Sequence, residues 1–120
     1  MKKPLSLAEG EYRFAALVWA NEPLSSGQLV RLAAEALGWK KSTTYTVLKK
    51  LCGRGLFRNE NGVVSAAISR EEFCAMQSER FVDETFSGSL PAFIAAFSTR
   101  KKLSEEELRE LEELIRRSRG

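Results

Sequence analysis

The hydrophobic positions of this chain recur at the spacing of an α-helix in six segments. We expect helices over about residues 7–20, 26–37, 41–52, 69–86, 90–97 and 104–115. Between the third and fourth of them, two short strand-like runs, 56–60 and 63–68, flank Asn61-Gly62. An Asn-Gly pair favours a two-residue type I′ turn, because both residues tolerate positive φ. The pattern therefore predicts a mostly helical protein with one small β-hairpin.

Serine-led capping boxes mark the starts of four expected helices. In a capping box the serine oxygen accepts the N–H of the residue three positions on, and the Glu or Gln side chain there accepts the serine N–H. The four boxes begin at Ser6, Ser25, Ser69 and Ser104. Pro91 suits the first turn of the fifth helix, where its missing N–H costs little. These local signals predict where five of the six helices begin.

The first and third expected helices each carry an apolar stripe at helical spacing. In the first helix we expect an inner face of Tyr12, Ala15, Ala16 and Trp19. In the third helix the inner stripe is Thr44, Val47, Leu48 and Leu51. The other side of the third helix carries hydroxyl and ammonium groups, which suit base edges and phosphate oxygens.

Helix, turn, helix and hairpin in this order predict a winged helix-turn-helix, with the third helix as the recognition helix. We expect hydroxyl groups in its first half to face the major groove, with lysines beside them on phosphates. The predicted DNA-contacting residues are Lys40, Lys41, Ser42, Thr43, Tyr45, Thr46, Lys49, Lys50, Arg58 and Asn61. Lys40 and Lys41 stand at a helix N-terminus, where positive charge opposes the helix dipole unless phosphates lie nearby.

The role of the hairpin is open between two alternatives. Arg58, Asn59 and Asn61 offer groups that could touch the DNA backbone or the minor groove. Glu60 would be repelled by phosphates. A plain hairpin that closes the core fits these residues as well as a wing that grips DNA.

Charge is distributed unevenly along this chain, whose net charge is +3. Residues 1–69 hold ten Lys or Arg and five Asp or Glu, whereas residues 70–120 hold nine and eleven. A basic front half and an acidic rear half fit a DNA-binding domain followed by an association region. We therefore expect a winged helix-turn-helix over residues 1–69 and a helical dimerisation region over residues 70–120.

The three rear helices carry more large apolar side chains than helices of this size can bury among themselves. Helices interleaved with those of a second copy would bury them, and would supply the two-fold symmetry of paired DNA half-sites. A small core within one chain is the alternative. The predicted dimerisation residues are Phe81, Leu90, Phe93, Ile94, Phe97, Leu108, Leu111, Leu114 and Ile115.

The composition argues against catalysis, metal binding and a membrane span. Histidine is absent, and Cys52 and Cys74 form no CxxC or CxC motif, so we expect no zinc site. With no glycine-rich phosphate loop either, we expect no cofactor and no enzymatic activity. The longest apolar run, residues 15–20, is too short to cross a bilayer, which predicts a cytoplasmic protein without membrane insertion.

Motifs along nearly the whole chain match one known family in order and spacing. The matching residues are Leu7, Glu11-Tyr12, Trp19, Trp39, Ser42-Thr43, Thr46-Val47-Leu48, Lys50-Leu51, Gly55, Ser69-Arg-Glu-Glu72, Phe81, Phe86-Ser-Gly88-Ser-Leu90 and Lys102-Leu-Ser-Glu-Glu-Glu107. In these segments the chain resembles the penicillinase-repressor (BlaI/MecI/CopY) family of bacterial transcription regulators.

The resemblance implies a homodimeric repressor that binds a dyad-symmetric DNA operator. In the β-lactam branch of the family, a membrane sensor with a metalloprotease domain triggers cleavage of the repressor in its dimerisation region. The matching bond here is Ala96-Phe97, although characterised members have Asn where this chain has Ala96. The copper branch carries a C-terminal CxC-type motif, which is missing from the end of this chain, residues 116–120. The resemblance thus implies DNA and a second copy as partners, with a sensor metalloprotease system as a further candidate.

A function of another class is a winged helix that docks a protein and does not read DNA. Salt dependence separates the two hypotheses. DNA binding through several phosphates weakens steeply with salt, because each phosphate contact releases bound counterions.

Overall fold

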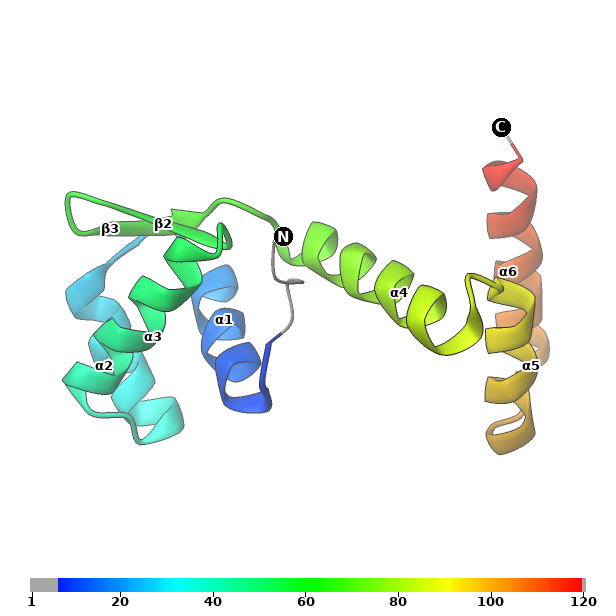
Figure 1. Cartoon of the computed structure of the whole chain (residues 1–120), viewed down its shortest axis with the longest axis horizontal. Coiled ribbons are helices and arrows are strands. Elements are labelled where there is room, and N and C mark those ends of the chain that lie inside the picture. Colours follow the sequence, from blue (N-terminus) through cyan, green and yellow to red (C-terminus); the bar gives the residue numbers. More distant parts are fainter. Residues whose placement is uncertain (1–6, 120) are drawn as a thin grey trace. The chain divides into compact units, whose positions relative to one another are not determined.

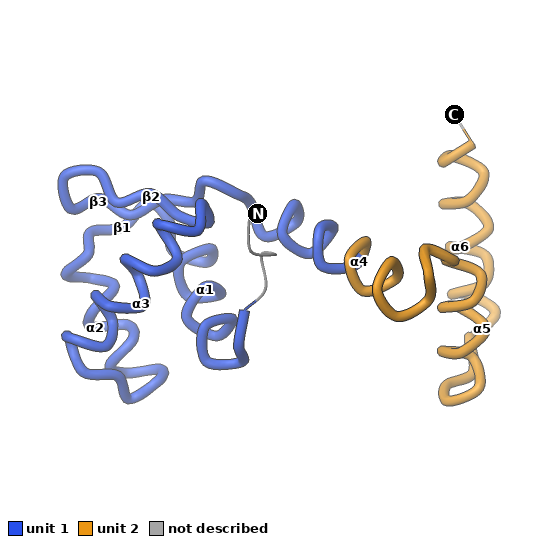
Figure 2. The backbone as a smooth tube through the Cα atoms, viewed as in Figure 1, with its two compact units in different colours: residues 1–78 blue, residues 79–120 orange. Residues whose placement is uncertain are grey.

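The structure is a computed structural model that describes residues 7–119. Its elements are α1 (Glu9–Asn21), β1 (Leu24–Ser25), α2 (Ser26–Leu37), α3 (Lys41–Gly53), β2 (Phe57–Glu60), β3 (Val63–Ala66), α4 (Arg70–Phe86), α5 (Leu90–Arg100) and α6 (Glu105–Ser118). The predicted class, mostly helical with a small β-hairpin, is confirmed (Figure 1). Two compact units divide inside α4 after Ser78, and we call them the front unit and the rear unit (Figure 2).

In the front unit, a small antiparallel sheet of order β1-β3-β2 accompanies α1, α2 and α3. The predicted two-residue turn joins β2 to β3, since Glu60 pairs with Val63 across it. Asn61 and Gly62 have φ of 54° and 82°, as a type I′ turn requires. β1 was not predicted; its two residues pair with β3 in the register Leu24 to Val64.

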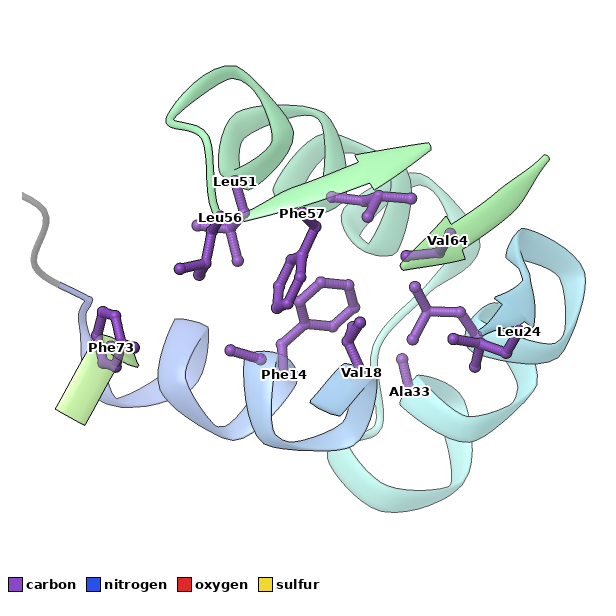
Figure 3. Packing of buried hydrophobic residues seen from close by; sticks show 12 residues of the cluster. Phe14, Val18, Leu24, Ala33, Leu51, Leu56, Phe57, Val64 and Phe73 are labelled. Carbon is purple, nitrogen blue, oxygen red and sulfur yellow. The ribbon is translucent and has the colours of Figure 1, made fainter. Parts of the chain in front are cut away.

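The core of the front unit gathers side chains from α1, α2, α3, the beginning of α4 and the sheet (Figure 3). In α1 the fully buried residues are Phe14, Ala15 and Val18. The predicted inner face was therefore only partly right, because Tyr12 and Trp19 lie at the margin of this core. The segment is apolar on most sides, so spacing alone did not fix which side faces inward.

Three of the four predicted capping boxes form. The backbone N–H groups of Gln28, Glu72 and Glu107 donate to the serine hydroxyls at 3.1, 3.0 and 3.1 Å. Ser6, the fourth predicted cap, lies outside the described residues. In its place, Ala8 precedes α1 and its N–H donates to Oε1 of Glu11 at 3.0 Å.

The beginning of α4 packs against the rest of the front unit through an aromatic cluster. The Trp19 ring lies 5.4 Å from the Phe73 ring and 5.6 Å from the Phe57 ring, measured between centroids. The indole N–H of Trp19 donates to the carbonyl oxygen of Ile68 at 3.0 Å. The front unit therefore extends beyond residue 69 and includes the first turns of α4.

The rear unit contains the end of α4 together with α5 and α6. α4 stops at a turn where Gly88 has φ of 81° and donates its N–H to the carbonyl oxygen of Val82 at 3.1 Å. The prediction that α5 ends near Phe97 is wrong, since it continues to Arg100. Ser98 lies within the helix, and its hydroxyl donates to the carbonyl oxygen of Ile94 at 2.8 Å. No helix within residues 7–119 is both long and apolar enough to cross a membrane.

Candidate nucleic-acid interface

α3 has one buried side and one exposed side. Thr44, Leu48 and Leu51 are buried, as predicted, and the Thr44 hydroxyl donates to the carbonyl of Lys40 at 3.2 Å. At 100° per residue, the side opposite this stripe presents Ser42, Thr46 and Lys49, which are all exposed. These three side chains form the exposed stripe of α3. Hydroxyls and a lysine at i, i+4 and i+7 give one face that can meet base edges and a phosphate.

The N-terminus of α3 is basic and uncapped. Lys40 occupies the N-cap position, and no side chain caps the helix there. Lys40 and Lys41 are both exposed, as the sequence analysis required of phosphate contacts. The positive end of the helix dipole is therefore flanked by two cations and favours an anion from outside the chain.

Ser26, at the first position of α2, joins α3 to the hairpin. Its hydroxyl accepts the Tyr45 hydroxyl at 3.2 Å, and its backbone N–H donates to the carbonyl of Gly62 at 2.9 Å. Tyr45 therefore lies on the side of α3 that faces α2 and the hairpin turn. Ser26 was not among the predicted residues, although a second serine directly after the Ser25 cap marks the position in the sequence.

The hairpin closes the core with one side and leaves the other exposed. Phe57 and Val64 are buried, whereas Arg58 on the other side and Asn61 in the turn are exposed. A shallow depression between α3 and β2 is lined by Tyr45, Leu48, Lys49, Cys52 and Asn59. The core-closing role of the hairpin is thus part of the fold, and its DNA contact remains a prediction.

Lys50 has an unpredicted partner within the protein. Its ammonium lies 2.6 Å from Oε2 of Glu11, at the beginning of α1. The side chain of Lys50 is 56% exposed, whereas that of Glu11 is only 15% exposed. The hydrogen bond from the ammonium of Lys50, and next the one from the N–H of Ala8, hold the pKa of Glu11 below its ordinary value. The carboxylate is therefore charged at neutral pH, and the pair is an ion pair.

Cys52 and Cys74 are free thiols that form no disulfide. Burial raises the pKa of Cys52, which keeps it protonated and poorly nucleophilic at neutral pH. Cys74 is exposed on α4. Within residues 7–119, no three Cys, Asp or Glu side chains come together as metal ligands would.

A family model, described as the penicillinase repressor family, matches residues 7–117 of this chain. The chain belongs to the penicillinase repressor family. The penicillinase repressor of Bacillus licheniformis is 22% identical over 119 residues, which cover 96% of this chain and 93% of that protein. Members of this family are transcriptional regulators, which confirms the prediction that the chain is not an enzyme.

A solved structure of a family member has the same fold. It is the solution structure of the Bacillus licheniformis BlaI monomeric form in complex with the blaP half-operator. It matches with a TM-score of 0.50 and 18% identity, over 60% of this chain and 93% of that one. At this identity the match shows the fold, a winged helix-turn-helix, and confirms that prediction.

The rear unit leaves its apolar side chains open to solvent. No residue between 79 and 119 is buried, and Phe81 and Ile115 are 51% and 61% exposed. The rings of Phe81, Phe86 and Phe93 contact one another edge to face, with centroids 5.6 to 5.9 Å apart. α5, α6 and the segment between them line a largely apolar depression. Its lining residues are Phe93, Ile94, Phe97, Leu103, Glu107, Glu110, Leu111 and Leu114. All nine predicted dimerisation residues are thus exposed or half-buried in a single chain.

The bond between Ala96 and Phe97 lies inside α5. The carbonyl of Ala96 accepts the Thr99 hydroxyl at 2.7 Å, and the carbonyl of Phe97 accepts the N–H of Lys101 at 3.1 Å. Proteolysis acts on a transiently opened backbone. Cleavage here therefore requires the last turns of α5 to unwind.

Proposed function

We propose that this chain is a transcriptional repressor that binds a dyad-symmetric DNA operator as a homodimer. The observation that carries the proposal is the exposed stripe of α3, which lies opposite the core in a member of a repressor family. The relative from Bacillus licheniformis was solved with a half-operator on the same fold, which supports DNA as the ligand. A protein of this function works in the cytoplasm, where the DNA is.

In this proposal α3 enters the major groove and other elements hold the backbone. Ser42 and Thr46 of the exposed stripe meet base edges, with Thr43 and Tyr45 at the sides of the helix. Lys40, Lys41 and Lys49 take phosphates, and the uncapped end of α3 adds its dipole. Arg58 and Asn61 of the hairpin are the candidates for a contact with the flanking backbone.

The test of groove reading is Thr46→Ala, after the preferred site has been selected from a random DNA pool. We expect a loss of roughly 1–3 kcal/mol on that site and little change on random DNA, because a hydroxyl on a base edge carries sequence information. Fluorescence anisotropy measures both affinities. Thr85→Ala is the matched control, since Thr85 is an exposed threonine of α4. Equal affinities for the Thr46 variant and the unchanged chain on the selected site would remove Thr46 from the groove.

The dimer is proposed from the rear unit. Exposed aromatic and aliphatic side chains on three short helices form a surface that a single chain leaves in water. α6 is a two-sided helix, with Leu108, Leu111, Leu114 and Ile115 on one side and charged residues on the other. A second copy carries the same surface, and a two-fold axis lets each copy cover the other.

The release of repression is proposed to follow damage to this dimer, by cleavage near Ala96-Phe97 in response to a membrane sensor metalloprotease system. Family membership supports the idea. The bond lies within α5 and follows an alanine. Unwinding of α5 is therefore a required first step. Cutting there separates α6 from the rest of the chain.

Truncation at the cleavage bond, which removes the last turn of α5 together with α6, tests the mechanical part of this proposal. A chain that ends at Ala96 should bind the selected operator about 10²–10⁴-fold more weakly than the full chain, because two tethered half-site contacts become independent ones. A chain that ends at Ser118 keeps all of α6 and serves as the control. Operator affinity that stays at the full-chain value in the Ala96 variant would exclude loss of α6 as the releasing event.

A winged helix that docks a protein remains the competing function. The two proposals differ in their dependence on salt, since a phosphate-binding surface should lose affinity steeply between 50 and 200 mM salt, about 10³–10⁵-fold for 6–10 contacts. A chain with no measurable affinity for duplex DNA at low salt would favour the protein-docking alternative.

A further inference from the structure

The Glu11 carboxylate connects the beginning of α1 to the last turns of α3. Its Oε1 accepts the N–H of Ala8 at 3.0 Å and its Oε2 accepts the ammonium of Lys50 at 2.6 Å. Both oxygens are therefore in use, and the side chain is only 15% exposed. The first turn of a helix also favours negative charge. Glu11 is thus fixed in place by the fold, independently of Lys50.

This anchoring limits what Lys50 can do. Contact of this ammonium with a DNA phosphate competes with a short, charge-assisted hydrogen bond to Glu11. The carboxylate cannot follow, because it also caps α1. Lys49, the neighbouring lysine, makes no ion pair with any residue between 7 and 119. Two adjacent lysines on the same helix therefore differ in their freedom to bind phosphate.

We propose that Glu11 is a positioning residue that holds Lys50 on the protein and keeps it out of the set of phosphate contacts. The recognition helix then offers Lys49, but not Lys50, to the DNA backbone. This inference rests on the proposed DNA-binding function and deepens it, because it sets how strongly the chain binds DNA of any sequence. The lowered pKa of Glu11 supports it, since the carboxylate keeps its charge at neutral pH.

The experiment measures the affinity of the full chain for a random-sequence duplex over a series of salt concentrations. Glu11→Gln keeps an oxygen that can accept the Ala8 N–H but loses the charge that holds Lys50. We expect this variant to bind the duplex more tightly and to show a steeper salt dependence. The slope of log K against log salt is negative. Its magnitude should increase by about 0.9 per protomer, the value of one added phosphate contact.

Matched variants separate this effect from a general change of charge. Glu9→Gln removes the same charge from the same turn of α1, and Glu9 makes no ion pair within residues 7–119. It should raise the slope much less than Glu11→Gln does. Lys49→Gln should decrease the magnitude of the slope by about 0.9, and Lys50→Gln should decrease it by less than half of that. In Glu11→Gln combined with Lys50→Gln, the increase should disappear, because the released ammonium is gone.

Two results would overturn the inference. One is a Lys50→Gln variant whose salt slope falls as far as that of Lys49→Gln, since Lys50 would then contact phosphate despite Glu11. The other is an equal rise in Glu9→Gln and Glu11→Gln. Thermal unfolding of each variant shows that α1 is intact. Failure of the proposed DNA binding would look different from failure of this inference. The unchanged chain would then have no affinity for the duplex at low salt, and no slope could be measured.

Discussion

Leu111→Asp is expected to turn the dimer into monomers and to weaken operator binding by about 10²–10⁴-fold. Leu111 lines the apolar depression between α5 and α6, where a second copy is proposed to pack. An unpaired carboxylate in such an interface must give up its water without a partner, which is strongly unfavourable. Sedimentation velocity gives the oligomeric state, and anisotropy on the selected operator gives the affinity.

Arg109→Asp is the control for this experiment, because it puts the same side chain on the charged side of α6. It should leave the dimer intact. The front unit should keep its fold in both variants, as circular dichroism and binding to random DNA can show. If Leu111→Asp remains dimeric at micromolar concentration, the apolar side of α6 packs within its own chain and the proposed interface is wrong.

Phe14→Ala is expected to destabilise the front unit by about 3–5 kcal/mol, the usual loss when a fully buried phenylalanine is truncated. Phe14 has no exposed surface and its ring stacks on Trp39 at 5.3 Å between centroids. Trp39 lies directly before α3, so the cavity would also loosen the position of that helix. Urea unfolding followed by tryptophan fluorescence measures the change in free energy.

Arg13→Ala tests whether the effect comes from the core, because Arg13 is an exposed neighbour in α1. A substitution at such a site usually changes stability by less than about 0.5 kcal/mol. Equal unfolding midpoints for the Phe14 variant and the unchanged chain would show that Phe14 does not contribute to the core as described.

Most of the fold could be predicted from the sequence because its signals are local. The boxes at Ser25 and Ser104 and the turn at Asn61-Gly62 depend on residues at most three positions apart, and all of them form. The buried stripe of α3 followed from spacing in the same way. Strand β1 was missed, since two residues carry no periodicity and their partner β3 lies far along the chain.

The candidate site was predictable in its residue types and less so in its contacts. The polar side of α3 followed from its spacing, yet the partner of Lys50 is Glu11, separated from it by 39 residues. The bond between Tyr45 and Ser26 likewise joins two helices. Such pairs depend on how the helices cross, and a single sequence does not show that.

If a second copy covers the exposed apolar side chains of the rear unit, the folding of that unit should depend on the concentration of the protein. α5 and α6 have 11 and 14 residues, lengths at which isolated helices are marginal in water. If a second copy supplies their missing core, dilution should melt them, whereas the front unit with its own core should be indifferent. The concentration of the repressor in a cell would then set two quantities. One is the fraction of chains in which both units are folded, and the other is the fraction of operator that is occupied.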